Sequence, residues 1–122
     1  MFLTLIQVGL GGAIGACLRF GVNVTAGRVV GPWATMGINI AGSAAMGVLV
    51  VVLALKGGQR VAPFLLTGML GGFTTFSAFS LDALTMWERG DTALATLYVT
   101  LSVTLSLLAV LAGAAAAREF LA

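Results

Sequence analysis

Two sets of polar residues recur inside otherwise apolar stretches of the chain. Each set has a spacing of four residues: Thr35, Asn39 and Ser43 in one, and Tyr98, Ser102 and Ser106 in the other. That spacing places the members of a set on one face of a helix. Such donors can bind a ligand or water, or they can join neighbouring helices by hydrogen bonds. The spacing alone leaves both interpretations open.

A third group is the run Gly-Gly-Phe-Thr-Thr-Phe-Ser-Ala-Phe-Ser at residues 71–80. Glycine and β-branched threonine are poor helix formers, so we expect the helix to unwind around Gly71 to Thr75. In lipid an unpaired backbone group costs several kcal/mol, and irregular backbone is tolerated only where protein or water covers it. Carbonyls freed there can coordinate a cation, and N–H groups that start the second half-helix favour an anion.

Phe76 and Phe79 lie three residues apart and share a face of that second half-helix. The edges of their rings carry partial positive charge. With hydroxyls and the Asn39 amide, they can surround a dehydrated small anion without a fixed positive charge. The alternative is that both rings only pack against other helices or face lipid.

The chain lacks the residues that several other kinds of functional site require. The chain has no histidine and a single cysteine, Cys17, which leaves no metal cluster, histidine proton shuttle or intrachain disulfide. No nucleophile is paired with a base, so we do not expect an enzyme. Asp82 lies about one turn from the end of its segment, where we expect it to pair with Arg19 or a loop cation.

The composition predicts an all-α integral membrane protein. Of 122 residues, 60% are hydrophobic and 8% are charged, whereas soluble domains average about 25% charged. Four apolar segments, at about 2–24, 33–55, 63–87 and 92–117, each suffice for the roughly 20 residues of a spanning helix. No basic residue precedes the first segment, so we expect no cleaved signal peptide and a single four-helix domain. No basic run suggests nucleic acid.

The charges do not decide how the four spans are oriented. The expected loops and termini place Lys56, Arg60 and Arg118 on one side of the membrane and Arg19, Arg28 and Arg89 on the other. This three-to-three balance gives the positive-inside rule no preference. Either context outside this sequence fixes a single orientation, or the chain inserts both ways, in which case antiparallel pairs can form. If Arg19 lies inside the membrane, the balance carries no information.

Small residues predict close packing between helices. Gly11 and Gly15 form one small-xxx-small pair, and Gly68 and Gly72 form another. A bundle of four helices is too small to enclose a hydrated path. Any conduction path therefore lies on its surface and needs a partner to complete it.

The motif at residues 71–79, the run Asn39-Ile40-Ala41-Gly42-Ser43 and an arginine ending the first span together resemble the Fluc (CrcB) fluoride channels of microorganisms. The resemblance covers the whole chain in length, span count and motif order. It implies an antiparallel, dual-topology homodimer with two pores and a structural sodium ion at the interface, exporting cytoplasmic fluoride passively through the inner (plasma) membrane. Ala78 and Ala44 depart from the residues common in the family, a hydroxyl residue and a phenylalanine.

The same resemblance implies roles for individual residues. Phe76 and Phe79 correspond to the phenylalanines that line the pores, and Asn39 to the pore asparagine. The main-chain carbonyls of Gly71 and Thr74 correspond to the sodium ligands. Arg19 corresponds to an arginine near the aqueous vestibule, where it can attract anions. The other implied pore residues are Thr35, Thr75, Ser77, Tyr98, Ser102 and Ser106.

Two further interpretations stay open. A small dual-topology exporter of organic cations shares the size and the charge balance, but it needs an intramembrane carboxylate and only Asp82 is available. A subunit that assembles a larger membrane complex would use the glycine faces and hydroxyls only for packing.

Overall fold

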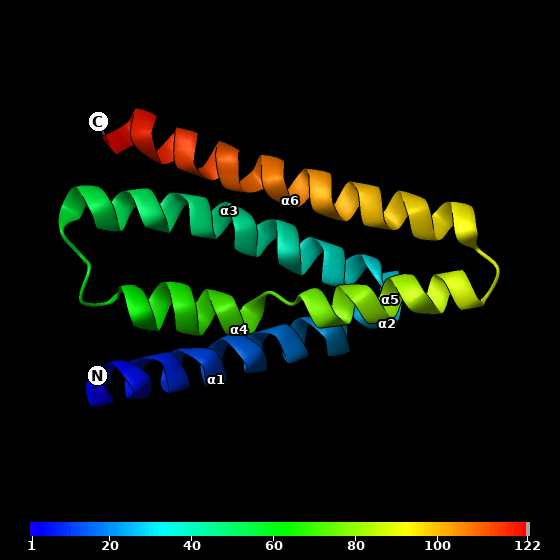
Figure 1. Cartoon of the computed structure of the whole chain (residues 1–122), viewed down its shortest axis with the longest axis horizontal. Coiled ribbons are helices and arrows are strands. Elements are labelled where there is room, and N and C mark those ends of the chain that lie inside the picture. Colours follow the sequence, from blue (N-terminus) through cyan, green and yellow to red (C-terminus); the bar gives the residue numbers. More distant parts are fainter. Residues whose placement is uncertain (122) are drawn as a thin grey trace.

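The computed structural model describes residues 1–121, and all regular structure in that range is helical. The helices, coloured along the chain in Figure 1, are α1 (Phe2–Thr25), α2 (Gly27–Val30), α3 (Trp33–Lys56), the π-helix η1 (Pro63–Leu70), α4 (Gly71–Phe73), α5 (Phe76–Glu88) and α6 (Thr92–Leu121).

Four helical stretches are long and apolar enough to cross a membrane. They are Phe2–Thr25, Trp33–Lys56, Pro63–Glu88 and Thr92–Leu121. Both chain ends lie at the same end of the molecule as the connection between α3 and η1 (Figure 1), as four antiparallel spans require. The prediction of a four-helix integral membrane protein is confirmed.

The helices pack in two close pairs, α3 with α6 and α1 with η1 and α4. Glycine makes both approaches possible. A Cβ on Gly47 would collide with the carbonyl oxygen of Val110 and lie 2.8 Å from Ala114 N, and a Cβ on Gly68 would lie 2.9 Å from Gly11 Cα. Backbones can meet this closely only where a side chain is missing. The close helix packing predicted from the small residues is therefore present, and the Gly11 and Gly68 pairs meet in it.

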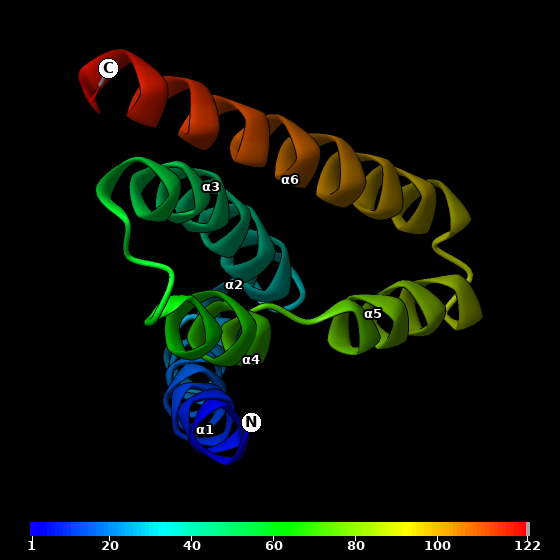
Figure 2. The same ribbon diagram turned by 60° about the vertical axis from the view of Figure 1, so that its left-hand side comes forward.

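The third span is irregular over more of its length than the sequence suggested. Residues 63–70 form a π-helix, which no pattern in the sequence predicted. Gly71 to Phe73 stay helical, so the expected unwinding at the glycine pair is wrong for these residues. The backbone is extended at Thr74 (ψ 152°) and Thr75 (ψ 124°), and helix resumes at Phe76. Figure 2 shows this stretch as a thin link between α4 and α5.

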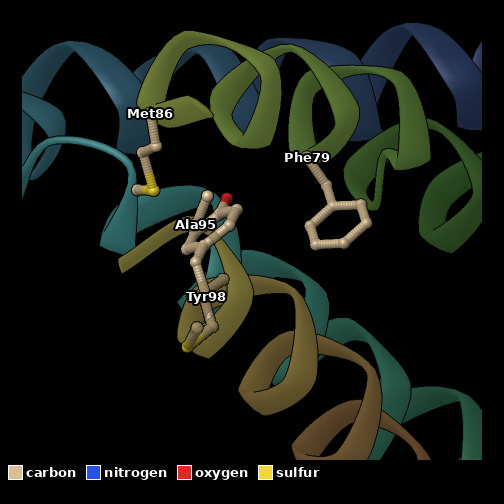
Figure 3. Close-up of a cluster of buried hydrophobic side chains, with 5 residues drawn as sticks. Phe79, Met86, Ala95 and Tyr98 are labelled. Carbon is tan, nitrogen blue, oxygen red and sulfur yellow. The ribbon is translucent and has the colours of Figure 1, made fainter. Parts of the chain in front are cut away.

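Away from the break, α5 leans towards one end of α6 (Figure 2). The buried side chains that join the two helices to α3 are Met36, Phe79, Met86, Ala95 and Tyr98. Figure 3 shows Phe79 and Met86 of α5 on the side of α5 that faces Tyr98 and Ala95 of α6. This cluster fixes α5 after the chain has lost its helical continuity.

Candidate functional site

A groove of about 420 Å³ runs along the face between α3, α6 and the break in the third span. Its lining residues are Asn39, Gly42, Ser43, Met46, Thr74, Thr75, Phe76, Phe79, Ser102, Val103, Ser106, Leu107 and Val110. None of these side chains is charged. The groove combines one amide and several hydroxyls with apolar and aromatic walls.

Asn39 holds the break from the side of α3. Its Oδ1 accepts a hydrogen bond of 2.8 Å from Thr75 N–H, and its Nδ2 donates one of 3.0 Å to the Thr75 carbonyl oxygen. The side-chain amide thus pairs with a backbone peptide group as a neighbouring strand would. Each backbone group left unpaired in lipid is costly, so these two hydrogen bonds stabilise the extended conformation of Thr75.

Gly42 allows the break to lie against α3. A Cβ at this position would collide with Thr74 Cγ2 and lie 3.4 Å from Phe73 Cδ2. In the sequence Gly42 stood out only as part of the motif that begins at Asn39. Its spacing of three residues from Asn39, on the same helix face, is the signal that could have identified it.

The hydrogen bonds at the break also free particular carbonyl groups. In a continuous helix Thr75 N–H would bond to the carbonyl of Gly71, and Ala78 N–H to that of Thr74. Here Thr75 N–H bonds to Asn39, and Ala78 N–H bonds to Thr75 Oγ1 at 3.2 Å, an N-cap for α5. Gly71 and Thr74 therefore lose the donors that a helix would give their carbonyls.

The two groove phenylalanines differ in exposure. Phe76 is 76% exposed, whereas Phe79 is 6% exposed. Their rings meet edge to face, with centroids 5.3 Å apart, and Phe79 stacks on Tyr98 at 5.5 Å. Figure 3 shows the Phe79 ring beside Tyr98. Phe79 is thus fixed from behind, while Phe76 projects from the surface of the chain.

Ser102 and Ser106 of α6 lie in the groove, as the four-residue spacing suggested. Ser102 is 4% exposed, and its Oγ has no hydrogen-bond partner among residues 1–121. A buried hydroxyl without a partner is unfavourable by about 1–3 kcal/mol. Such a group marks a place where a ligand or water can bind.

Three residues expected to line the pore lie outside the groove. Tyr98 is fully buried, and its hydroxyl donates to Asp82 Oδ2 at 2.9 Å, with the Pro32 carbonyl oxygen 3.3 Å away. Thr35 is buried and lines a second crevice beside Asp82. Ser77 is exposed, and its hydroxyl lies 3.1 Å from Thr75 Oγ1.

The expected pairing of Asp82 with Arg19 is wrong. Asp82 accepts the Tyr98 hydroxyl, and Arg19 Nε donates to the Gly72 carbonyl at 3.1 Å. Spacing along the chain could not reveal either contact, because both join residues on different helices. Ala78, one of the departures from the resemblance, lies in the same second crevice as Asp82.

Known proteins similar to this chain identify its family. The family model described as "CrcB-like protein, Camphor Resistance (CrcB)" matches residues 6–114. The chain belongs to the CrcB family. A protein of Paracoccus denitrificans named "Fluoride-specific ion channel FluC" is 58% identical over 121 residues, covering 98% of both chains. A protein of the same name from Cereibacter sphaeroides is 59% identical and covers 100% of both.

Membership of the CrcB family settles two of the earlier expectations. The resemblance to this family is confirmed over nearly the whole chain. The related proteins are named ion channels, so the chain belongs to a family of transporters and not of enzymes.

Proposed function

We propose that this CrcB protein is a passive, fluoride-selective channel whose conduction path is the groove between α3, α5 and α6. The observation that carries the proposal is the Ser102 hydroxyl, which is buried in the groove and has no hydrogen-bond partner in the part of the chain that the structure describes. Ser106 lies one helical turn away, and the Asn39 amide and the ring of Phe79 line the same groove. Fluoride is assigned as the ion because the two relatives described above are named fluoride-specific ion channels.

The chemistry of the groove suits a small anion that must shed its water. Hydroxyl protons, the second amide hydrogen of Asn39 and the positive edges of aromatic rings can replace a hydration shell. Conduction requires binding that is strong enough for entry and weak enough for exit. A groove lined by neutral donors meets both needs, because no fixed cation holds the anion.

The channel is an antiparallel homodimer with two pores in this proposal. The groove lies on the surface of one chain, and Phe76 beside it is 76% exposed. A second copy facing this surface would cover Phe76 and close the path. Arg19 lies within α1 against Gly72, so the loops and ends carry three positive charges on one side and two on the other, which gives no strong preference between opposite orientations. Two equivalent grooves then give two pores.

The break supplies carbonyl oxygens that fit a sodium ion. Alkali ions take hard oxygen ligands, and replacing their water needs several of them at one point. The carbonyls of Gly71 and Thr74 lack their helical donors, because Asn39 and Thr75 Oγ1 take those N–H groups. We assign these two carbonyls to a structural sodium ion at the dimer interface, where the second copy supplies the same pair. The ion would bind carbonyl oxygens for which lipid offers no hydrogen-bond donor.

The proposed setting is the inner (plasma) membrane of the cell, with the four apolar helices in contact with lipid. Fluoride leaves the cytoplasm down its electrochemical gradient, without a coupled ion. The partners are thus fluoride, lipid and a second copy of the chain.

Reconstitution tests the proposal. Purified protein in liposomes loaded with potassium fluoride should release fluoride to an external electrode once valinomycin allows potassium to follow. Liposomes loaded with potassium chloride should release almost no chloride under the same conditions. Fluoride release no faster than from protein-free liposomes, or equal release of both ions, would refute the proposal.

The structure weakens the alternative of an organic-cation exporter. That mechanism needs a carboxylate free to exchange a proton for a cation. The Asp82 carboxylate instead accepts the Tyr98 hydroxyl, which is fully buried. Proton-driven uptake of a lipophilic cation that disappears in Asp82→Asn would support the exporter.

A further inference from the structure

Arg19 reaches from α1 to the end of α4. Its Nε donates a hydrogen bond of 3.1 Å to the carbonyl oxygen of Gly72, and its side chain is half-buried. The backbones of α1 and α4 nearly touch at Gly72. A Cβ on this residue would lie 2.6 Å from Gly12 O and 3.2 Å from Ala16 N. Close packing therefore brings the guanidinium to a fixed place.

The Gly72 carbonyl is one that the break deprives of a partner. In a continuous helix it would accept the N–H of Phe76, four residues later. Phe76 instead opens α5 after two extended residues, and the N–H groups of a helix's first turn have no intrahelical acceptor. Arg19 replaces the missing donor at Gly72 as Asn39 replaces the missing acceptor for Thr75.

We propose that Arg19 is a positioning residue that stabilises the break of the third span through its bond to Gly72. It thereby holds Thr75 and Phe76 where they line the groove. In this assignment the donor at Nε matters and the positive charge does not. The transport part of the proposal rests on the proposed fluoride channel, whereas the structural part can be tested without transport.

Three substitutions separate the donor from the charge. Glutamine has an amide nitrogen the same number of bonds from Cα as arginine Nε, so Arg19→Gln keeps the donor and removes the charge. Lysine has a carbon at that point and its ammonium one atom further, so Arg19→Lys keeps the charge and displaces the donor. Arg19→Met removes both. The variant Arg28→Gln, on α2 away from the break, is the matched control for loss of one charge.

The first readout is hydrogen–deuterium exchange of the peptide covering residues 71–78 in detergent-solubilised dimer. Arg19→Gln and Arg28→Gln should exchange as the unmodified protein does. Arg19→Lys and Arg19→Met should exchange about tenfold faster in this peptide, since the Gly72 carbonyl loses its hydrogen-bond donor and the break opens more easily. Peptides from α6 should not change in any variant, which separates local opening from general unfolding.

The second readout is fluoride efflux from liposomes, with the same ranking expected: Arg19→Gln close to the unmodified protein, and the other two slower by about tenfold. Normal efflux in Arg19→Lys with slow efflux in Arg19→Gln would show that Arg19 acts by its charge and would overturn the proposal. Unchanged exchange in Arg19→Met would also overturn it. If the unmodified protein moves no fluoride, the channel assignment fails, and the exchange ranking still decides the role of Arg19.

Discussion

Phe76 and Phe79 share one face of α5, yet their surroundings differ. Phe79 is buried against Tyr98, and Phe76 is exposed at the edge of the groove. The sequence could predict the shared face from the spacing. It could not predict the difference in burial, because Tyr98 lies on another helix and its position depends on the bond to Asp82.

Replacing Phe76 with isoleucine tests whether an exposed ring serves transport. The side chain stays apolar but loses the polarised ring edge, so we expect fluoride efflux to fall about tenfold or more while the protein stays folded. Efflux from liposomes and size-exclusion chromatography would measure the two properties. Phe20→Ile, at a 70% exposed phenylalanine on α1, is the control and should transport normally. Normal transport by Phe76→Ile would mean that this ring only packs.

Ser102→Ala tests the buried Ser102 hydroxyl. Since Ser102 Oγ makes no hydrogen bond within the described residues, its removal should raise the free energy of unfolding by about 1–3 kcal/mol. Fluoride efflux should fall about fivefold, because the anion loses a donor. Thermal unfolding in detergent and liposome efflux measure these effects. A loss of stability with unchanged efflux would assign Ser102 to packing, and Thr104→Val, at an exposed residue of the same helix, is the matched control.

Among the elements, the third span decides the architecture of the site. The glycine and threonine run predicted irregular backbone between residues 71 and 75. The structure leaves the glycines helical and extends the threonines. The reason is tertiary: Gly72 packs against Gly12 of α1, and Asn39 of α3 offers both a donor and an acceptor to Thr75. Local propensity indicated a break, but partners on two other helices determine where it falls.

Asn39→Leu tests this dependence. The variant removes both hydrogen bonds to Thr75, each contributing about 1–2 kcal/mol in a membrane, so we expect a loss of about 2–4 kcal/mol in stability. Thermal unfolding of the detergent-solubilised protein gives the loss. Ser43→Ala, in the same groove and without those bonds, should lose far less. Equal stability of the two variants would contradict the role of Asn39 in holding the break.

For the whole molecule, the four spans could be predicted from hydropathy, because lipid requires long apolar helices; the last helix runs to Leu121, beyond the expected end at 117. The glycine spacings predicted only that helices pack closely. They could not show which helices pair, such as α1 with η1 through Gly11 and Gly68. The contacts of Arg19 and Asp82 could not be anticipated, since a charged side chain carries no sequence signal for a partner on another helix.

Without Arg19, which lies within α1, the loops and ends carry three positive charges on one side and two on the other. This near balance predicts that the chain inserts in both orientations. Reporters of side, fused to the C-terminus, should show comparable populations with the terminus inside and outside the cell. One added charge should shift the populations in opposite directions: Gln59→Lys should favour the terminus inside, and Val29→Lys, at an 86% exposed position on the other side, should favour it outside. A single orientation that neither variant changes would refute dual topology.

Blocking the groove and measuring fluoride efflux tests most directly whether fluoride passes through it. In a Cys17→Ser background, Ser106→Cys places a single thiol in the groove, and methyl methanethiosulfonate adds a small group to it. We predict that modified protein in liposomes releases fluoride no faster than protein-free liposomes. The unmodified variant should still release fluoride well above that level, and the treated background protein should transport normally. Unchanged fluoride efflux after complete modification, verified by mass spectrometry, would show that fluoride takes another path.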